Sequence, residues 1–302
     1  MTATRLTWGT AALLVVPPLM WAGNAVVGRM MNGLVPPITL NFLRWAVAFA
    51  LLLPLASWVL RPGSGLREHW RHYALLALLG VGCYNALQYL ALKTSTPLNV
   101  TLVAASMPVF MLFTGWLSFG QSVTQRQLAG ALLSICGVLF VLSRGDWQTL
   151  AAMQLVPGDL FILLATLCWA YYSWLLGRTT EPAQIRADWA AFLMAQIVPG
   201  LVWSGSFAAI EWAVLPDAHI AWGPPVFAAL AFIAICPAII AYRCWGLGVQ
   251  RAGAAVAGFF SNLTPLFAAV MSAALLGESP HWYHAVAFGL IVGGIVLSSS
   301  KR

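Results

Sequence analysis

Charged residues are scarce in this chain. Of its 302 residues only 8% are charged, whereas 61% are hydrophobic, and mean hydropathy is +0.84. A soluble globule of this length could not keep so much apolar surface from water, so we expect a polytopic membrane protein. The five cysteines form no CxxC pair, which argues against a disulfide framework or a thiolate metal cluster. They are better interpreted as small apolar packing residues.

Other features that would indicate particular functions are also missing. The net charge of +7 would suit nucleic acid, but the sequence has no basic run, so we expect no nucleic-acid partner. His281 and His284 follow Glu278 at spacings of three, yet in a helix His284 would point about 120° away from Glu278, so no metal is expected. No acid, base and nucleophile gather at one depth. We therefore expect neither an enzyme nor a cofactor.

Ten apolar segments are long enough to cross a bilayer of about 30 Å. The breaks between them carry proline, glycine or charge. The predicted spans are 9–28, 38–60, 73–92, 99–119, 127–143, 158–177, 189–210, 226–247, 254–276 and 282–300.

The chain contains an internal duplication. A shift of 157 residues aligns Gly82–Ser143 with Ile239–Ser300. The residues that coincide include prolines and glycines that interrupt or end the apolar segments. The matched pairs are Pro108 and Pro265, Phe110 and Phe267, Gly120 and Gly277, Ser122 and Ser279, Leu133 and Leu290, and Gly137 and Gly294. The predicted repeats are 1–147 and 148–302, with five spans each. An odd number of spans inverts the second copy relative to the first, as in many secondary transporters.

The positive charges predict an orientation. With both termini in the cytoplasm, eleven Lys and Arg residues fall inside and four outside, which satisfies the positive-inside rule. Glu211, Asp217 and Glu278 are predicted to lie outside.

Polar and aromatic side chains within the spans are the candidate substrate site. Polar groups are costly in hydrocarbon, so they usually have a role, although hydrogen bonding between helices is one such role. Aromatic residues have packing and interface positions as an alternative explanation. In the third span Tyr84 with Gln88 and Asn85 with Tyr89 form two adjacent ridges. The candidates are Trp21, Asn24, Tyr84, Asn85, Gln88, Ser106, Trp169, Tyr172, Tyr242, Trp245 and Asn262. Arg44 is a candidate carboxylate contact, whereas Arg243 is better explained by a position at the interface.

The order of these motifs resembles the EamA-type drug/metabolite transporter superfamily over the whole chain, and within it the YddG-type aromatic amino-acid exporters of bacterial inner membranes. The similarity rests on Trp-Ala at 21–22 and 169–170, Arg44, P-x-F at 108–110 and 265–267, Leu276-Gly277-Glu278 and the glycine-rich 289–294. The family often has Gly-Glu at the end of the fourth helix, but here this position is Gly120-Gln121.

The resemblance implies a ten-helix exporter in the inner membrane, a small amphipathic substrate such as an amino acid with an aromatic or apolar side chain, and a central cavity between the repeats. Efflux of drugs, nucleosides or sugars is an alternative, and a non-transporting membrane scaffold is another. No carboxylate or His lies mid-span, which favours facilitated export without an obligatory proton. Small-xxx-small pairs at Gly130 and Ser134 and at Gly289 and Gly293 are compatible with a monomer or a homodimer.

Overall fold

The computed structural model describes residues 6–95, 97–152, 154, 156–178, 180–276 and 281–299. Within this part of the chain, eight helices are long and apolar enough to cross a membrane. Two shorter apolar helices, Met107–Phe119 and Ala254–Ala268, occupy the positions of the fourth and ninth predicted spans. The described residues contain no strand. The predicted all-α polytopic membrane fold is confirmed.

The helices follow the chain in the predicted order. The first half contains α1 (Trp8–Met30), α2 (Pro37–Ala56), η1 (Ser57–Leu60), α3 (Trp70–Ala77), η2 (Leu78–Cys83), α4 (Tyr84–Thr94), α5 (Pro97–Ala104), α6 (Met107–Phe119) and α7 (Gln125–Ser143). The short α8 (Trp147–Ala151) precedes the second half. That half contains α9 (Pro157–Leu176), α10 (Ala183–Ala187), α11 (Trp189–Val214), α12 (Pro224–Ile233), η3 (Ala234–Ile240), α13 (Ala241–Ala252), α14 (Ala254–Phe260), η4 (Ser261–Leu263), α15 (Thr264–Leu276) and α16 (Trp282–Ser299).

Irregular turns recur at matching positions in the two halves. The third span contains the π-helical turn η2, and a shift of 157 residues moves Leu78–Cys83 to 235–240, inside the π-helical turn η3. Pro237 has no N–H to donate, which favours the wider turn in η3. The fourth span is interrupted between α5 and α6 just before Pro108, and the ninth at η4 just before Pro265.

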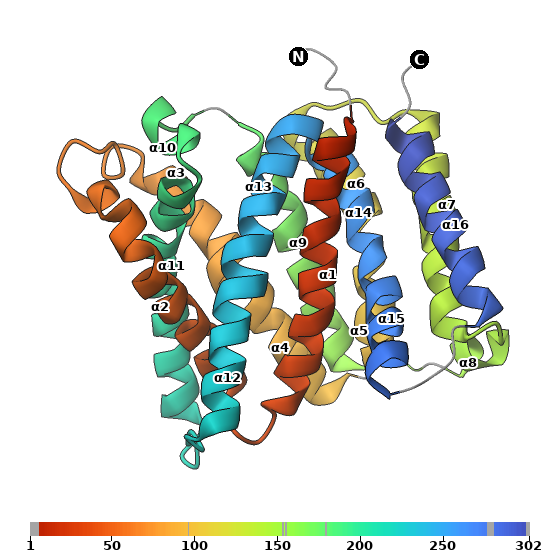
Figure 1. Cartoon of the computed structure of the whole chain (residues 1–302), viewed down its shortest axis with the longest axis horizontal. Helices are drawn as coiled ribbons and strands as arrows, with labels where there is room; N and C mark the ends of the chain where they lie inside the picture. Colours follow the sequence, from red (N-terminus) through yellow and green to blue (C-terminus); the bar gives the residue numbers. More distant parts are fainter. Residues whose placement is uncertain are drawn as a thin grey trace.

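The two halves run in opposite directions. Figure 1 shows α1 beginning and α16 ending at the same end of the molecule, whereas α8 lies at the other end. We call the end where α1 begins and α16 ends the terminus end. Helix α1 therefore runs away from the terminus end, and α9 runs back toward it.

Glycines bring α7 and α16 into close contact. A Cβ atom added to Gly294 would lie 2.6 Å from the carbonyl oxygen of Gly130, and one added to Gly130 would lie 2.7 Å from that of Gly294. Only glycine permits this approach, which is how small residues join membrane helices. The Gly130 and Ser134 pair therefore packs within the chain, while nothing lies within 4 Å of a Cβ built on Gly289.

Helix α2 begins against a carboxylate from the second half. Glu211 on α11 is buried and accepts hydrogen bonds from the backbone N–H groups of Ile38 and Thr39, at 3.1 and 2.7 Å, and from the Thr39 hydroxyl at 2.8 Å. It satisfies N–H groups that the first turn of a helix leaves unpaired. The predicted seventh span ends at residue 210, whereas α11 continues to Val214, so Glu211 lies in the last turn of the helix, at the end of the molecule away from the termini. The position of Glu278 lies outside the described residues.

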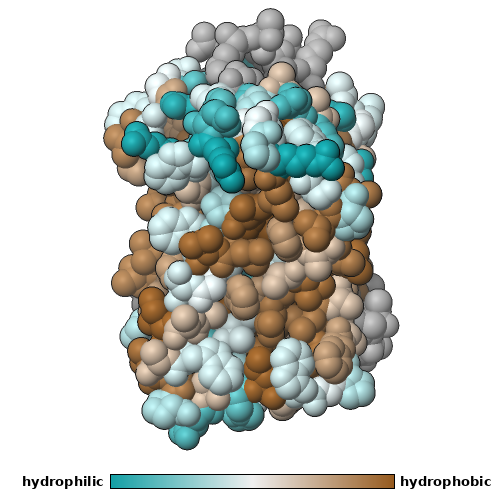
Figure 2. Space-filling view, turned by 90° about the vertical axis from the view of Figure 1, so that its left-hand side faces the viewer, coloured by the Kyte–Doolittle hydropathy of each residue, from teal (hydrophilic) through white to brown (hydrophobic). Residues whose placement is uncertain are grey.

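The surface has the polarity of a membrane protein. On the face around α2, α10 and α11, Figure 2 shows an apolar band between a strongly polar terminus end and a less apolar opposite end. Trp70 and Trp222, at opposite ends of the helices, are 59% and 55% exposed, as expected for aromatic residues at a membrane interface.

Candidate functional site

Arg44 lies inside the helix bundle. It follows the start of α2 by seven residues, which is about 10 Å along the helix axis. The whole residue is 0% exposed. Its Nη1 donates to Asn85 Oδ1 on α4 at 2.8 Å and lies 3.5 Å from Asn24 Oδ1 on α1. Three helices of the first half therefore meet at one guanidinium.

The remaining donors of Arg44 are unsatisfied. No described residue accepts a hydrogen bond from Nε or Nη2, although both atoms are buried. Among the described side chains, the carboxylates that form salt bridges do so elsewhere, and none pairs with Arg44. A buried cation without a counter-charge is costly. An anionic ligand would offset that cost.

The predicted aromatic residues form one cluster around Trp169 of α9. The centroid of its ring lies 5.1 Å from that of Trp21, 4.5 Å from Tyr84 and 5.5 Å from Trp245. Tyr172 and Tyr242 join the cluster at 4.9 and 5.2 Å. Helices α1, α4, α9 and α13 contribute these rings, so the cluster lies between the two halves. The indole Nε1 of Trp169 has no hydrogen-bond partner among the described residues.

Asn85 connects the arginine with the aromatic cluster. Its Nδ2 donates to the Tyr242 hydroxyl at 3.3 Å, and that hydroxyl donates to the Gly80 carbonyl in the irregular turn η2. The hydroxyl of Tyr89 donates to Asn24 Oδ1 at 3.1 Å. The ridge of Asn85 and Tyr89 thus faces Arg44.

The other ridge of α4 borders a separate cavity. Gln88 and Tyr84 line it with Trp21 and Asn262, and its volume is about 80 Å³. Asn262 donates to Ser134 at 2.9 Å, but its Oδ1 and the Ser261 hydroxyl have no described partner. Ser106 is not part of this group, because its hydroxyl bonds back to the Val103 carbonyl at 2.5 Å.

The centre of the molecule is packed in this conformation. Ligand pockets usually have volumes of about 300 to 1,000 Å³, so the cavity beside Gln88 cannot hold a metabolite. A second space, lined by Tyr172, Gln196 and Arg186, measures about 20 Å³. The sequence predicted an open central cavity; the structure brings most of its lining residues together but closes it.

Three neighbours of the site were missed by the sequence reasoning. Gln196 on α11 accepts a hydrogen bond from the Tyr172 hydroxyl at 2.8 Å, and Ser173 accepts one from Trp245 at 3.0 Å. Trp45 packs against Tyr242 with ring centroids 4.9 Å apart. The polar character of Gln196 at membrane depth was the signal that could have revealed it.

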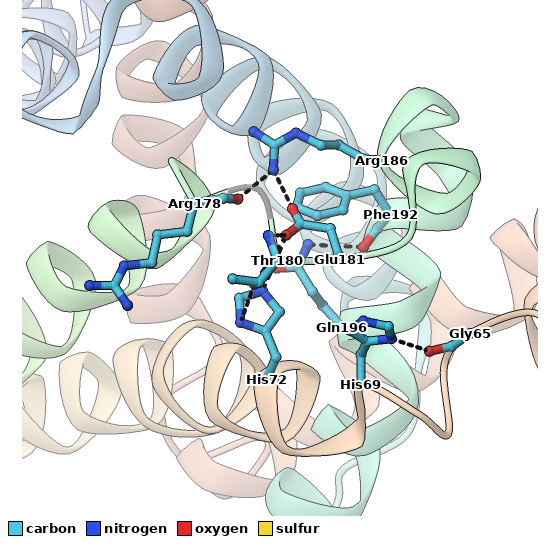
Figure 3. A network of polar contacts seen from close by, with 9 residues as sticks. All are labelled: Gly65, His69, His72, Arg178, Thr180, Glu181, Arg186, Phe192 and Gln196. Carbon is cyan, nitrogen blue, oxygen red and sulfur yellow. Dashed lines mark hydrogen bonds and ion pairs between the residues drawn. The ribbon is translucent and has the colours of Figure 1, made fainter. Parts of the chain in front are cut away.

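A buried carboxylate connects the two halves at the terminus end. Glu181, in the connection between α9 and α10, pairs with Arg186 and lies 3.7 Å from His72 Nε2 on α3. Figure 3 shows the carboxylate between these two partners, with Thr180 beside His72. The Glu181 side chain is fully buried. We refer to Glu181, Arg186 and His72 as the terminus-end latch, since they join the two halves.

Comparison with known proteins identifies the family. A model of the EamA-like transporter family matches residues 8–143 and again 156–300. The chain belongs to this family. Like other EamA-like proteins, it is a multi-pass membrane protein, and the predicted superfamily is confirmed.

Several curated EamA-like relatives match nearly the whole chain. An uncharacterized transporter of Archaeoglobus fulgidus is 26% identical over 97% of this chain and 98% of its own. The aromatic amino acid exporter YddG of Ancylobacter novellus is 25% identical and covers 93% of each chain. A probable amino-acid metabolite efflux pump of Escherichia coli is 26% identical over 96% of this chain and 94% of its own. A crystal structure with 22% identity shares the fold with a TM-score of 0.73, covering 96% of this chain and 97% of its own.

Proposed function

We propose that this EamA-like protein exports small amphipathic carboxylates, above all amino acids with aromatic or apolar side chains, by alternating access between the two halves. The proposal rests on Arg44, which is buried, has two nitrogen atoms without hydrogen-bond acceptors, and forms no salt bridge with a described carboxylate. A substrate carboxylate can accept two parallel hydrogen bonds from a guanidinium. It would supply both the missing acceptors and the missing negative charge.

The aromatic cluster supports an apolar or aromatic substrate side chain. Trp169 and its neighbours separate the halves at the level where Asn85 joins Arg44 to Tyr242. Rearrangement of these rings would open a ring-lined space beside the guanidinium. The names of the Ancylobacter and Escherichia relatives agree with this substrate class. Neutral sugars and nucleosides would leave the charge of Arg44 uncompensated. A membrane scaffold that binds no solute would not explain why a buried arginine lacks a counter-charge.

Transport is facilitated in this account, without an obligatory proton. The two described carboxylates inside the apolar helices both accept hydrogen bonds at helix starts. Glu211 serves α2, and Asp159 accepts from the backbone N–H of Val156 at 2.9 Å at the start of α9. Both are therefore structural groups in this conformation. Transport that required an imposed pH gradient would contradict this part of the proposal.

The distribution of cations supports cytoplasmic termini in a bacterial inner membrane. Arg61, Arg67 and Arg71 lie in or beside the loop between α2 and α3, at the polar terminus end. The proposal requires no residue from a second copy, so it applies equally to a monomer and to a homodimer.

Counterflow in proteoliposomes tests the proposed function. Vesicles loaded with unlabelled amino acid should accumulate labelled L-phenylalanine when they contain the protein. Asn85→Ala, Gln88→Ala and Trp169→Ala should reduce this exchange while the proteins still fold. Arg144→Gln, which removes an exposed cation outside these contacts, is the control. If all three site variants fold and exchange like the parent, the site assignment is wrong.

A further inference from the structure

Two adjoining cavities lie at the end of the molecule away from the termini. Their volumes are about 310 and 270 Å³, and they share Asn32, Val35, Pro37 and Lys93 as lining residues. The loop between α1 and α2 forms one side, and residues 215–219, which follow α11, form the other. Each is close to or above the lower size of ordinary ligand pockets, about 300 Å³.

We propose that these cavities, here called the outer vestibule, form a second binding site for a zwitterionic amino acid on its way out. This inference rests on the proposed function and assigns a site separate from Arg44. The substrate would leave the central site past Tyr89, bind in the vestibule, and then dissociate.

The walls of the vestibule fit such a ligand. Lys93, in the last turn of α4, is exposed and offers a cation for a carboxylate. No described carboxylate forms a salt bridge with it. Asp217 offers an anion for an ammonium group from the opposite side. Met31, Val35 and Leu40 are buried and form the apolar wall that a hydrophobic side chain needs.

Tyr89 connects the vestibule with the central site. Its side chain lines the larger cavity, while its hydroxyl bonds to Asn24, which also lies next to Arg44 Nη1. Tyr89 therefore contacts both sites. A Cβ atom on Gly28 would come within 2.9 Å of this ring, so the glycine at this position allows Tyr89 to lie across the passage.

At the opposite end, a space of about 950 Å³ lies between the start of α7 and the end of α16, but none of the central aromatic residues line it. There the cavity that reaches Tyr172 and Tyr242 measures about 20 Å³ and is bordered by Arg186 of the terminus-end latch. Of the cavities that border residues of the central site, the substrate-sized one thus lies on the vestibule side. This asymmetry predicts that the vestibule affects binding from one side of the membrane only.

Sided kinetics test the proposal. The half-saturating concentration of L-phenylalanine is measured separately on each face of uniformly oriented proteoliposomes, for the parent, Lys93→Gln and Asp217→Asn. Each variant should raise it on the vestibule side by about fivefold, as expected for loss of one exposed charge contact. The value on the terminus side should stay unchanged. Arg144→Gln should match the parent, because Arg144 follows α7 in the turn before α8 and lines neither cavity.

The outcomes separate the two proposals. If the parent exchanges L-phenylalanine but the vestibule variants match it on both sides, the vestibule is not a binding site and the proposed function stands. An equal change on both sides would also overturn the inference, because it would indicate an effect on the whole cycle. If the parent exchanges neither L-phenylalanine nor any other labelled amino acid, the proposed function fails and the inference fails with it. Thermal unfolding of each variant shows that it is folded.

Discussion

Arg44 and Asn85 are joined by a 2.8 Å hydrogen bond from Nη1 to Oδ1, between α2 and α4. The same amide group donates to Tyr242 of the second half. The Asn85 side chain therefore positions the Arg44 guanidinium and also links it to Tyr242 of the second half. A substrate carboxylate that binds Arg44 would compete for this arrangement, which gives a physical route from substrate binding to a rearrangement of the halves.

Removing the charge of Arg44 should reduce transport without reducing the stability of the fold. We expect Arg44→Gln to reduce carboxylate exchange by at least about tenfold, the effect of losing roughly 1.4 kcal/mol of binding. The melting temperature in detergent should stay equal or rise, because a buried, unpaired cation disfavours folding. Arg44→Lys should not restore full exchange, since an ammonium lacks the planar fork. A large fall in melting temperature would show that Arg44 is a structural group.

The packing of α7 on α16 should depend on glycine at one position and not at another. Gly294→Ala places a Cβ atom 2.6 Å from a backbone carbonyl, so we expect a loss of about 1 to 3 kcal/mol in unfolding free energy. Gly289→Ala on the same helix meets nothing within 4 Å and should be neutral or stabilising by about 0.5 to 1 kcal/mol. Thermal unfolding of both variants measures the difference. Equal stabilities would contradict the close helix contact.

Helix α2 should depend on a carboxylate from the other half. Glu211→Gln removes charge-assisted hydrogen bonds to Ile38 and Thr39 and should destabilise the protein by about 1 to 2 kcal/mol. Glu68→Gln is the matched control, because Glu68 is exposed, and we expect no measurable change. If the two variants unfold alike, Glu211 does not cap α2.

The terminus-end latch should have to open during transport. In a background without native cysteines, His72→Cys with Thr180→Cys places two thiols where the present side chains lie 3.3 Å apart. Bridging them with a short bifunctional thiol reagent should stop counterflow, and reduction should restore it. The two single-cysteine variants treated in the same way should remain active. Full activity of the bridged protein would mean that this end does not move.

The sequence was sufficient to predict the ten apolar segments, because bilayer thickness fixes their length and turn residues mark their ends. It also predicted most of the side chains that surround Trp169 and Arg44, since polar residues at membrane depth are few, but it missed Trp45, one of many aromatic residues in the spans. It could not predict that Glu211 would cap α2, because the two lie more than 170 residues apart in sequence. Nor could it predict a closed centre, because cavity volume depends on the conformation of the two halves rather than on which residues line them.

The need for a carboxylate tests the account most directly. Counterflow of labelled L-phenylalanine is measured with excess unlabelled L-phenylalanine or with excess 2-phenylethylamine, which keeps the ring and the amine but lacks the carboxylate. The account predicts that phenylalanine competes fully and that the amine competes at least tenfold more weakly, a preference lost in Arg44→Gln, as expected if roughly 1.4 kcal/mol comes from the guanidinium. Equal competition by the two compounds in the parent protein would contradict it.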